Sequence, residues 1–184
     1  MARFVAFLRA INVGGHVVTM EALRGHFGAI GLRDVDTFIA SGNVIFDSGA
    51  ADLAALERKI EKRLLAELGY DVATFLRSDS EVARIARYLP FPEAQMRTAG
   101  AVSVGFLGEA PSPADKQLIL GLKTDNDSFH VNGREVYWMC QTGQGESKMS
   151  NVQFEKAMKR KITFRGMRTV ERLAARLATA GMRR

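Results

Sequence analysis

The feature that most constrains the fold is the order of apolar and amphipathic segments along the chain. In the first half, short apolar runs typical of strands occupy residues 4–8, 35–39, 44–46 and 72–76. Two segments with apolar residues at helical spacing, 20–30 and 53–68, lie between these runs. The predicted order is therefore strand, helix, strand, strand, helix, strand.

The second half of the chain repeats this order. Its predicted strands are 102–107, 129–131, 135–139 and 162–164. Predicted helices open at Ser112 and Ser150, and a last amphipathic helix starts at Thr169. The repeat is one of element order and not of residue identity, and we interpret it as an internal duplication.

Each half matches the split-βαβ pattern of ferredoxin-like domains. Right-handed crossover connections then predict an antiparallel sheet with both helices on one face. The expected class is α+β, with two tandem ferredoxin-like (βαββαβ) units, a linker helix and a C-terminal helix. We place the first unit with its trailing helix at 1–89 and the second unit at 101–184. Residues 90–100, which hold two prolines and a glycine, are the expected linker.

Short motifs mark where the predicted elements begin. Thr19 and Asp52 have side chains that cap helix N-termini, and the segment 78–81 is a capping box. Asn132-Gly133 is the strongest short hairpin signal in the chain. The cap and turn chemistry therefore agrees with the segment order.

The composition excludes several classes of protein. No apolar run is long enough to span a bilayer, and Arg9 interrupts the apolar start too early for a signal peptide, so we expect a cytoplasmic protein without a membrane partner. The single cysteine, Cys140, excludes an intramolecular disulfide and a cysteine-based zinc site. The three histidines lack the spacing of metal ligands, and neither a metal nor a cofactor is expected.

Charge is unevenly distributed along the chain. Residues 156–184 carry ten Lys or Arg and one acid, Glu171, so this segment has a net charge of +9. The whole chain has a charge of +6, which leaves −3 for the remainder. A basic end of this kind suggests an anionic partner, although a solvated helix face has the same composition.

Two loops in the first half are expected at one edge of its sheet. The first two strands of a split-βαβ unit run in the same direction, so the loop 9–15 and the turn 41–43 fall at the same edge. Glycine in such loops either turns the chain or lets the backbone approach a ligand. The candidate ligand-binding residues here are Arg9, Asn12, Gly14, Gly15, Ser41 and Asn43.

The loop 143–148 and the end of the last strand form a second candidate cluster, at the opposite edge of the second sheet. The loop precedes a predicted helix N-terminus, where free N–H groups and the helix dipole favour an anion. It lacks the Walker A pattern and the third glycine of a dinucleotide-binding fingerprint. The candidate residues are Ser147, Lys148 and Arg165, and a plain flexible loop is the alternative interpretation.

Several blocks of the sequence resemble a known bacterial family. They are LRAINVGG, MEALR, SGNVIF, GREVYW, GQGESKMSN and TFRGMRTVERLA. In this order, over nearly the whole chain, they are similar to the family catalogued as domain of unknown function 1697. The resemblance implies a cytoplasmic α+β protein without an established activity and offers no catalytic residue. Ala10 and Gly166-Met167-Arg168 depart from the family pattern, which usually has Gly and Asn-Trp-Asn there.

Three functions are open from the sequence. The favoured one is binding of a small phosphate- or carboxylate-bearing ligand at the glycine-containing loops. Catalysis is left undecided because no catalytic residue can be assigned. The alternatives are nucleic-acid binding through the basic C-terminal helix, and a structural or interaction module without a ligand. The oligomeric state is also open.

Overall fold

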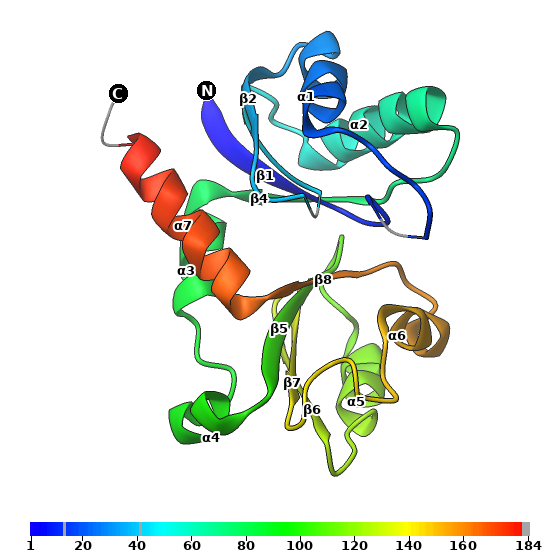
Figure 1. The fold of residues 1–184 in the computed structure, drawn as a ribbon, viewed down its shortest axis with the longest axis vertical. Helices are drawn as coiled ribbons and strands as arrows, with labels where there is room; N and C mark the ends of the chain where they lie inside the picture. Colours follow the sequence, from blue (N-terminus) through cyan, green and yellow to red (C-terminus); the bar gives the residue numbers. More distant parts are fainter. Residues whose placement is uncertain (13, 41, 182–184) are drawn as a thin grey trace. The chain divides into compact units, whose positions relative to one another are not determined.

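The computed structural model describes residues 1–12, 14–40 and 42–181. Over these residues the chain is a mixed α+β protein with eight strands and seven helices (Figure 1). It divides into two compact units, Met1–Ala83 and Arg84–Arg184. The sequence instead places the boundary in a linker at 90–100, and a linker with that role stays a prediction.

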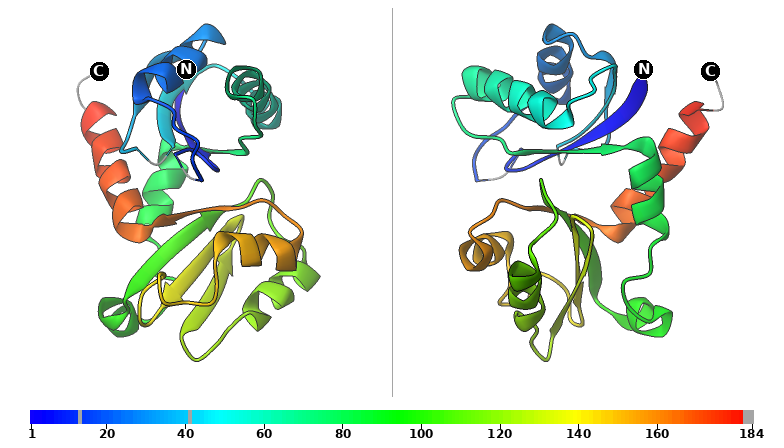
Figure 2. Two further views of the ribbon diagram at one scale, coloured as in Figure 1. Left: turned by 45° about the vertical axis from the view of Figure 1, so that its right-hand side comes forward. Right: turned by 180° about the vertical axis from the view of Figure 1, so that it is seen from behind.

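The first unit is built around a four-stranded antiparallel sheet. Its elements are β1 (Ala2–Leu8), α1 (Met20–Ala29), β2 (Arg33–Thr37), β3 (Asn43–Ser48), α2 (Leu53–Leu68) and β4 (Thr74–Ser78). The strand order is β2-β3-β1-β4, and each neighbouring pair is antiparallel. Helices α1 and α2 both lie on the same side of this sheet (Figures 1 and 2).

Local chemistry explains where these helices begin and end. The Thr19 hydroxyl accepts a hydrogen bond from Ala22 N at 3.1 Å, and Asp52 Oδ1 accepts one from Ala55 N at 2.9 Å. Gly69 ends α2 in the left-handed conformation with φ of 77°. Their apolar stripes and alternate strand residues form one core, made by Phe4, Ala6, Leu8, Leu23, Phe27, Val44, Phe46, Leu56, Ile60 and Leu64.

The second unit has a sheet of the same kind. Its elements, after α3 (Asp79–Arg87), which crosses the division, are α4 (Glu93–Thr98), β5 (Ala101–Phe106), α5 (Pro113–Gly121), β6 (Asp127–Asn132), β7 (Glu135–Cys140), α6 (Asn151–Met158), β8 (Thr163–Gly166) and α7 (Met167–Gly181). The strand order is β6-β7-β5-β8, again antiparallel throughout.

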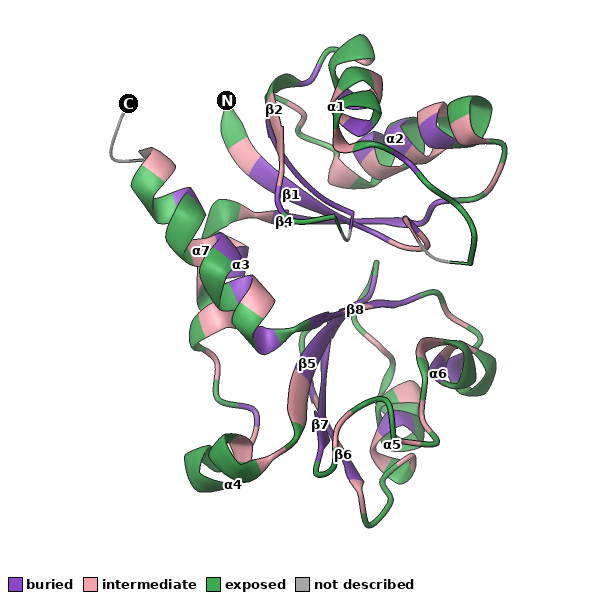
Figure 3. Ribbon diagram, viewed as in Figure 1, coloured by how far each residue is buried: buried purple, intermediate pink, exposed green. Residues whose placement is uncertain are grey.

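The second core lies between this sheet and the helices α5 and α6. Ser112 and Ser150 cap these two helices by accepting from Asp115 N and Gln153 N, as the sequence predicts. The β6–β7 hairpin turns at Asn132-Gly133, where Gly133 has φ of 60°. The buried side chains are Ile119, Phe129, Val131, Val136, Trp138, Cys140, Phe154 and Met158. Figure 3 shows purple, buried strands beside helices with green outer faces.

Most strands differ from the predicted bounds by one or two residues; β4, for example, is Thr74–Ser78 and not 72–76. Three differences concern the second strand, the linker and the last helix. The second strand is Arg33–Thr37 and not 35–39, because Ile39 adopts φ of 51° and Phe38 N donates to Asn43 O in the turn. Helix α4 forms inside the predicted linker, since Pro92 stands just before it, where a missing N–H costs no helical hydrogen bond. Helix α7 starts at Met167, two residues before the predicted start.

No helix in the described ranges is long and apolar enough to cross a membrane. The cytoplasmic location expected from the sequence stays a prediction.

Candidate functional site

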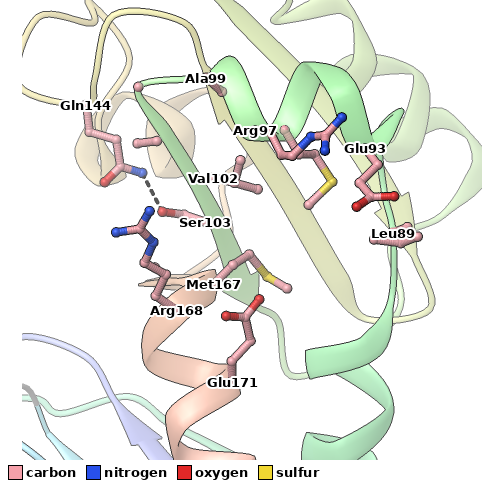
Figure 4. Close-up of a pocket in the computed structure, with 14 residues that line it drawn as sticks. Leu89, Glu93, Arg97, Ala99, Val102, Ser103, Gln144, Met167, Arg168 and Glu171 are labelled. Atoms are coloured by element: carbon pink, nitrogen blue, oxygen red, sulfur yellow. Dashed lines mark hydrogen bonds between the residues drawn. The ribbon is translucent and has the colours of Figure 1, made fainter.

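A pocket of about 620 Å³ lies in the second unit where α4, the start of β5, the loop after β7 and the start of α7 come together (Figure 4). Part of its lining is apolar and is made by Leu89, Met96, Val102 and Met167. The polar and charged lining residues are Glu93, Arg97, Ser103, Gln144, Arg168 and Glu171. A pocket that combines apolar surface with a few polar groups is the usual form of a small-molecule site.

One end of the pocket is organised by a hydrogen bond between two polar side chains. Ser103, on β5, is only 3% exposed, and its hydroxyl accepts a hydrogen bond from Gln144 Nε2 at 2.8 Å. Ser103 also pairs with Gly166 across the β5–β8 ladder, so the start of α7 lies next to it. The loop after β7 and the end of β8 therefore meet at one edge of the sheet, as the topology predicts.

Close packing fixes the path of the loop that carries Gln144. Gly100 N donates to Gln141 O at 2.8 Å, and a Cβ on Gly100 would lie 2.5 Å from Gly143 N. Only glycine allows the two backbones to approach this closely. From the other side, Asn126 Oδ1 accepts from Thr142 N at 3.1 Å. The loop is thus held from both sides before it reaches the pocket.

A buried carboxylate holds the far end of the same loop. Asp127, 2% exposed, accepts from Trp138 Nε1 at 2.7 Å, from Thr124 Oγ1 at 2.9 Å and from Ser147 Oγ at 2.8 Å. Burial alone raises the pKa of Asp127, but these hydrogen bonds outweigh it and hold the pKa below its ordinary value. The candidate residue Ser147 is therefore engaged in supporting the loop.

The first turn of α7 presents a cation to the pocket. Arg168 lies in this turn, which contains no acidic residue. Arg168 has no hydrogen bond or ion pair with any residue that the structure describes, whereas Arg172 and Arg176 on the same helix each have a partner in the chain. In Figure 4 its guanidinium extends toward the end where Gln144 donates to Ser103.

The two polar loops of the first unit also meet, but their asparagines are used internally. Asn12 Oδ1 accepts from Val18 N at 2.7 Å, and Asn12 Nδ2 donates to Ala40 O at 3.0 Å. Asn43 is completely buried, and its Nδ2 donates to Phe38 O at 3.0 Å. Asn43 therefore closes its own turn, and Asn12 ties its loop to Ala40 of the other loop. A ligand role for either one stays a prediction.

The other predicted residues of these loops differ in their surroundings. Gly14 and Gly15 have φ of 61° and 88°, and the space beside each Cα is open. Arg9 is half-buried and has a partner in the chain. Ser41 lies outside the described residues. The glycines therefore account for the turn, and ligand binding here is untested.

The two predicted cations of the second cluster are placed differently. Lys148 is exposed. Arg165 is buried, and its Nη1 donates to Thr163 Oγ1 at 2.7 Å and to Phe164 O at 2.9 Å. Burial lowers the pKa of Arg165 to about 10, which still leaves it protonated at neutral pH. Arg165 thus has an internal role, and Lys148 is the predicted cation that faces solvent.

Of the residues that line the pocket, the sequence singles out only Gln144, inside the candidate loop 143–148, and Gly166-Met167-Arg168, as a departure from the family pattern. Ser103, Glu93, Arg97 and Glu171 carry no motif, because strands, loops and helices bring them together only in the folded unit. One signal was available in the sequence. Arg168 stands in the first turn of a helix, and no acid shares that turn, which is unfavourable next to the positive end of the helix dipole.

Comparison with known families identifies the family of the chain. The sequence model described as protein of unknown function (DUF1697) matches residues 1–137. The chain belongs to this family. The resemblance seen in the sequence motifs is therefore confirmed, and the function of the family is unknown. Gln144, Arg168 and Glu171 lie beyond the matched residues, so family membership assigns them no role.

A solved structure has the same overall fold. A conserved bacterial protein from Streptococcus pneumoniae superposes with a TM-score of 0.71 and 24% sequence identity, over 97% of this chain and 99% of that chain. Identity at this level shows the fold alone. None of the curated proteins compared with the chain matches it.

Proposed function

We propose that the protein binds a small ligand bearing a carboxylate or a phosphate, in the pocket of the second unit. The anionic group would lie at the first turn of α7, beside Arg168, Gln144 and Ser103. This proposal keeps the ligand class favoured by the sequence. It leaves out the loops of the first unit and keeps part of the second candidate cluster, the loop 143–148 that carries Gln144, with Arg168 in place of Lys148 and Arg165.

The observation that carries the proposal is the guanidinium of Arg168 at the start of α7, which has no partner among the residues that the structure describes. The first four N–H groups of a helix lack intrahelical partners and form its positive end. A cation in this turn adds to that positive charge and costs about 0.3–1 kcal/mol in an exposed helix. A bound anion would be stabilised by both the helix N–H groups and Arg168.

Two neutral groups support the same end of the pocket. Gln144 uses one of its two amide hydrogens on Ser103 and retains the other. The Ser103 hydroxyl accepts that bond and has its own hydrogen to donate. Both are therefore donors available to an oxygen of the ligand.

The test compares one arginine variant, Arg168→Gln, with one lysine variant, Lys148→Gln. Binding of hexanoate and of inorganic phosphate is measured by titration calorimetry at low salt, for the parent protein, Arg168→Gln and Lys148→Gln. We expect Arg168→Gln to weaken binding about tenfold or more, the loss of one charged contact of roughly 1.4 kcal/mol. Lys148→Gln, which removes the exposed cation of the sequence-predicted loop, should leave affinity unchanged.

The control is Arg58→Gln, which removes an exposed charge on α2 of the first unit. A loss with Lys148→Gln and not with Arg168→Gln would return the site to the loop 143–148. No binding of either anion by the parent protein would favour the structural or interaction module.

Nucleic-acid binding through the C-terminal helix is the second candidate. Arg168, Arg172 and Arg176 are exposed at four-residue spacing on α7, which places them along one face. Two of the three already have partners in the chain, so less charge is available than the sequence indicates. A steep fall of oligonucleotide affinity with salt would support this function, and a flat response would exclude it.

We also infer that both units are ferredoxin-like. The strand orders β2-β3-β1-β4 and β6-β7-β5-β8, each with a strand–helix–strand–strand–helix–strand sequence, support this topology. Cytoplasmic location is proposed on the same sequence grounds as before.

A further inference from the structure

We infer that the ligand of the α4–β5–α7 pocket is a small zwitterion, with its anionic group at Arg168 and an ammonium group facing Glu171 and Glu93. This inference rests on the proposed function and narrows its ligand class. It is carried by the balance of charge around the pocket and by the absence of ion pairs between these charges and any described residue.

The pocket lining carries two cations and two anions. Arg97 and Glu93 come from α4, and Arg168 and Glu171 come from α7. Their formal charges cancel, so the lining as a whole is neutral. A site built for a simple anion would carry an excess of positive charge. Two carboxylates beside a bound monoanion would instead repel it.

None of these four charges is neutralised within the described part of the chain. Neither the Glu93–Arg97 pair, four residues apart, nor the Arg168–Glu171 pair, three residues apart, forms an ion pair, and no other described residue binds them. Opposite charges at these helical spacings commonly meet. Each charge around this pocket is thus available to a ligand of opposite sign.

Arg168 is also separated from the two carboxylates in a way that suits one ligand with two charged ends, whereas Arg97 lies on the α4 side with Glu93. Arg168 and Glu171 are three residues apart on α7, about 4.5 Å along a helix axis. In Figure 4, Arg168 extends toward Ser103 and Gln144, while Glu171 lies further along α7 and Glu93 lies on the α4 side. The two carboxylates are therefore away from the end proposed for the anion.

The surface between these ends is apolar. Met96, Val102 and Met167 line the pocket, and Met167 is buried. A methionine lining adapts to unbranched carbon chains because its thioether is flexible. The ligand class that fits is an amino acid with an aliphatic chain, in which the ammonium stands at either the α or the terminal carbon.

The experiment uses four probes that share a six-carbon chain. Hexanoate carries only the anion, hexylamine only the cation, and norleucine and 6-aminohexanoate carry both. Affinities are measured by titration calorimetry on the full chain at low salt. We expect the better zwitterion to bind about tenfold or more tightly than hexanoate, since it adds a second charged contact.

Variants assign each end of the ligand. Glu171→Gln should remove the advantage of the zwitterion and leave hexanoate affinity unchanged or slightly higher. Glu93→Gln is measured in parallel to show which carboxylate faces each zwitterion. Arg168→Gln should weaken hexanoate and both zwitterions alike. Glu21→Gln, an exposed acid on α1 of the first unit, is the matched control and should change nothing. All these residues except Glu93 lie on helices longer than two turns, and all are exposed, so folding should be retained.

Failure of this inference and failure of the proposed function give different results. If hexanoate binds as tightly as either zwitterion and only Arg168→Gln weakens it, the zwitterion is wrong and the anion site stands. If neither hexanoate nor the zwitterions bind, or if Arg168→Gln has no effect, both proposals are overturned.

Discussion

The helices that follow the last strand of each unit begin in opposite ways. Helix α3 continues directly from β4, and α7 continues directly from β8. At the start of α3, Ser78 N donates to Glu81 Oε2 at 2.8 Å and Glu81 N donates to the Ser78 hydroxyl at 3.2 Å. Asp79 adds a second acid to this turn. The first turn of α7 has Arg168 and no acid.

The difference shows which of the two helices has its N-terminus capped and its dipole compensated by its own residues. The capping box and two acids of α3 satisfy its free N–H groups and oppose its dipole. At α7 the same topological position leaves positive charge without a counter-charge from the first turn. A polar helix start therefore indicates a ligand only when its own side chains leave the free N–H groups without acceptors and the dipole without a counter-charge.

The same distinction separates the predicted loop residues from the pocket residues. Asn12 and Asn43 resemble ligand-binding groups in the sequence, yet their amides bond to Val18, Ala40 and Phe38. The charged groups of the pocket have no such partners among the described residues. The loop residues and the pocket residues therefore differ in whether their polar groups already have hydrogen-bond partners, and not in residue type.

The largest effect on stability is expected from removing the hydrogen bonds through which Asp127 holds the loop beside α7. Asp127→Asn cannot accept from Trp138, Thr124 and Ser147 as the carboxylate does, and should destabilise the fold by about 1–3 kcal/mol at neutral pH. The parent protein should also lose stability as pH falls. Because folding lowers the pKa of Asp127, the unfolded chain takes up the proton first, and the contribution present above pH ~4 is lost below it.

Urea unfolding between pH 3 and pH 7, followed by the fluorescence of Trp138, the single tryptophan, measures this effect. Asp125→Asn changes an exposed neighbouring acid and serves as the control. Equal acid sensitivity of the parent protein and Asp127→Asn would show that other groups are responsible.

A smaller loss of stability is expected from removing the N-terminal cap of α3. Ser78→Ala removes the acceptor for Glu81 N and should cost about 1 kcal/mol, the usual value of a helix cap. In a chain of this size that loss lowers the melting temperature by about 2–4 °C. Differential scanning calorimetry provides the measurement, and an unchanged melting temperature would mean that the cap does not distinguish α3 from α7.

The smallest effect on stability is expected at the start of α7, and its sign is reversed. Arg168→Glu places an acid in the first turn, as in α3, and should stabilise the ligand-free protein by about 0.3–1 kcal/mol. The same change should abolish binding of hexanoate. A variant that is more stable but does not bind hexanoate would indicate that Arg168 is kept for binding at a cost in stability. Loss of stability in this variant would contradict the dipole argument.

Much of the fold follows from local sequence signals. Thr19, Asp52, Ser112 and Ser150 each cap the helix that the sequence assigns to them. Asn132-Gly133 forms the predicted hairpin. The prolines within 90–100 are typical helix breakers, yet α4 forms there because Pro92 precedes the helix and does not interrupt it.

The sequence by itself determined the element order, the caps and turns, and the positions of most core residues, because these depend on contacts within a few residues and on the period of apolar side chains. The tertiary structure alone decided which polar groups are satisfied. Ser147 is bound by Asp127, twenty residues before it in the chain, and Gln144 by Ser103, forty-one residues before it. Such pairings arise only when distant strands and loops are packed together, so the pocket beside Arg168 could not be assigned from the sequence.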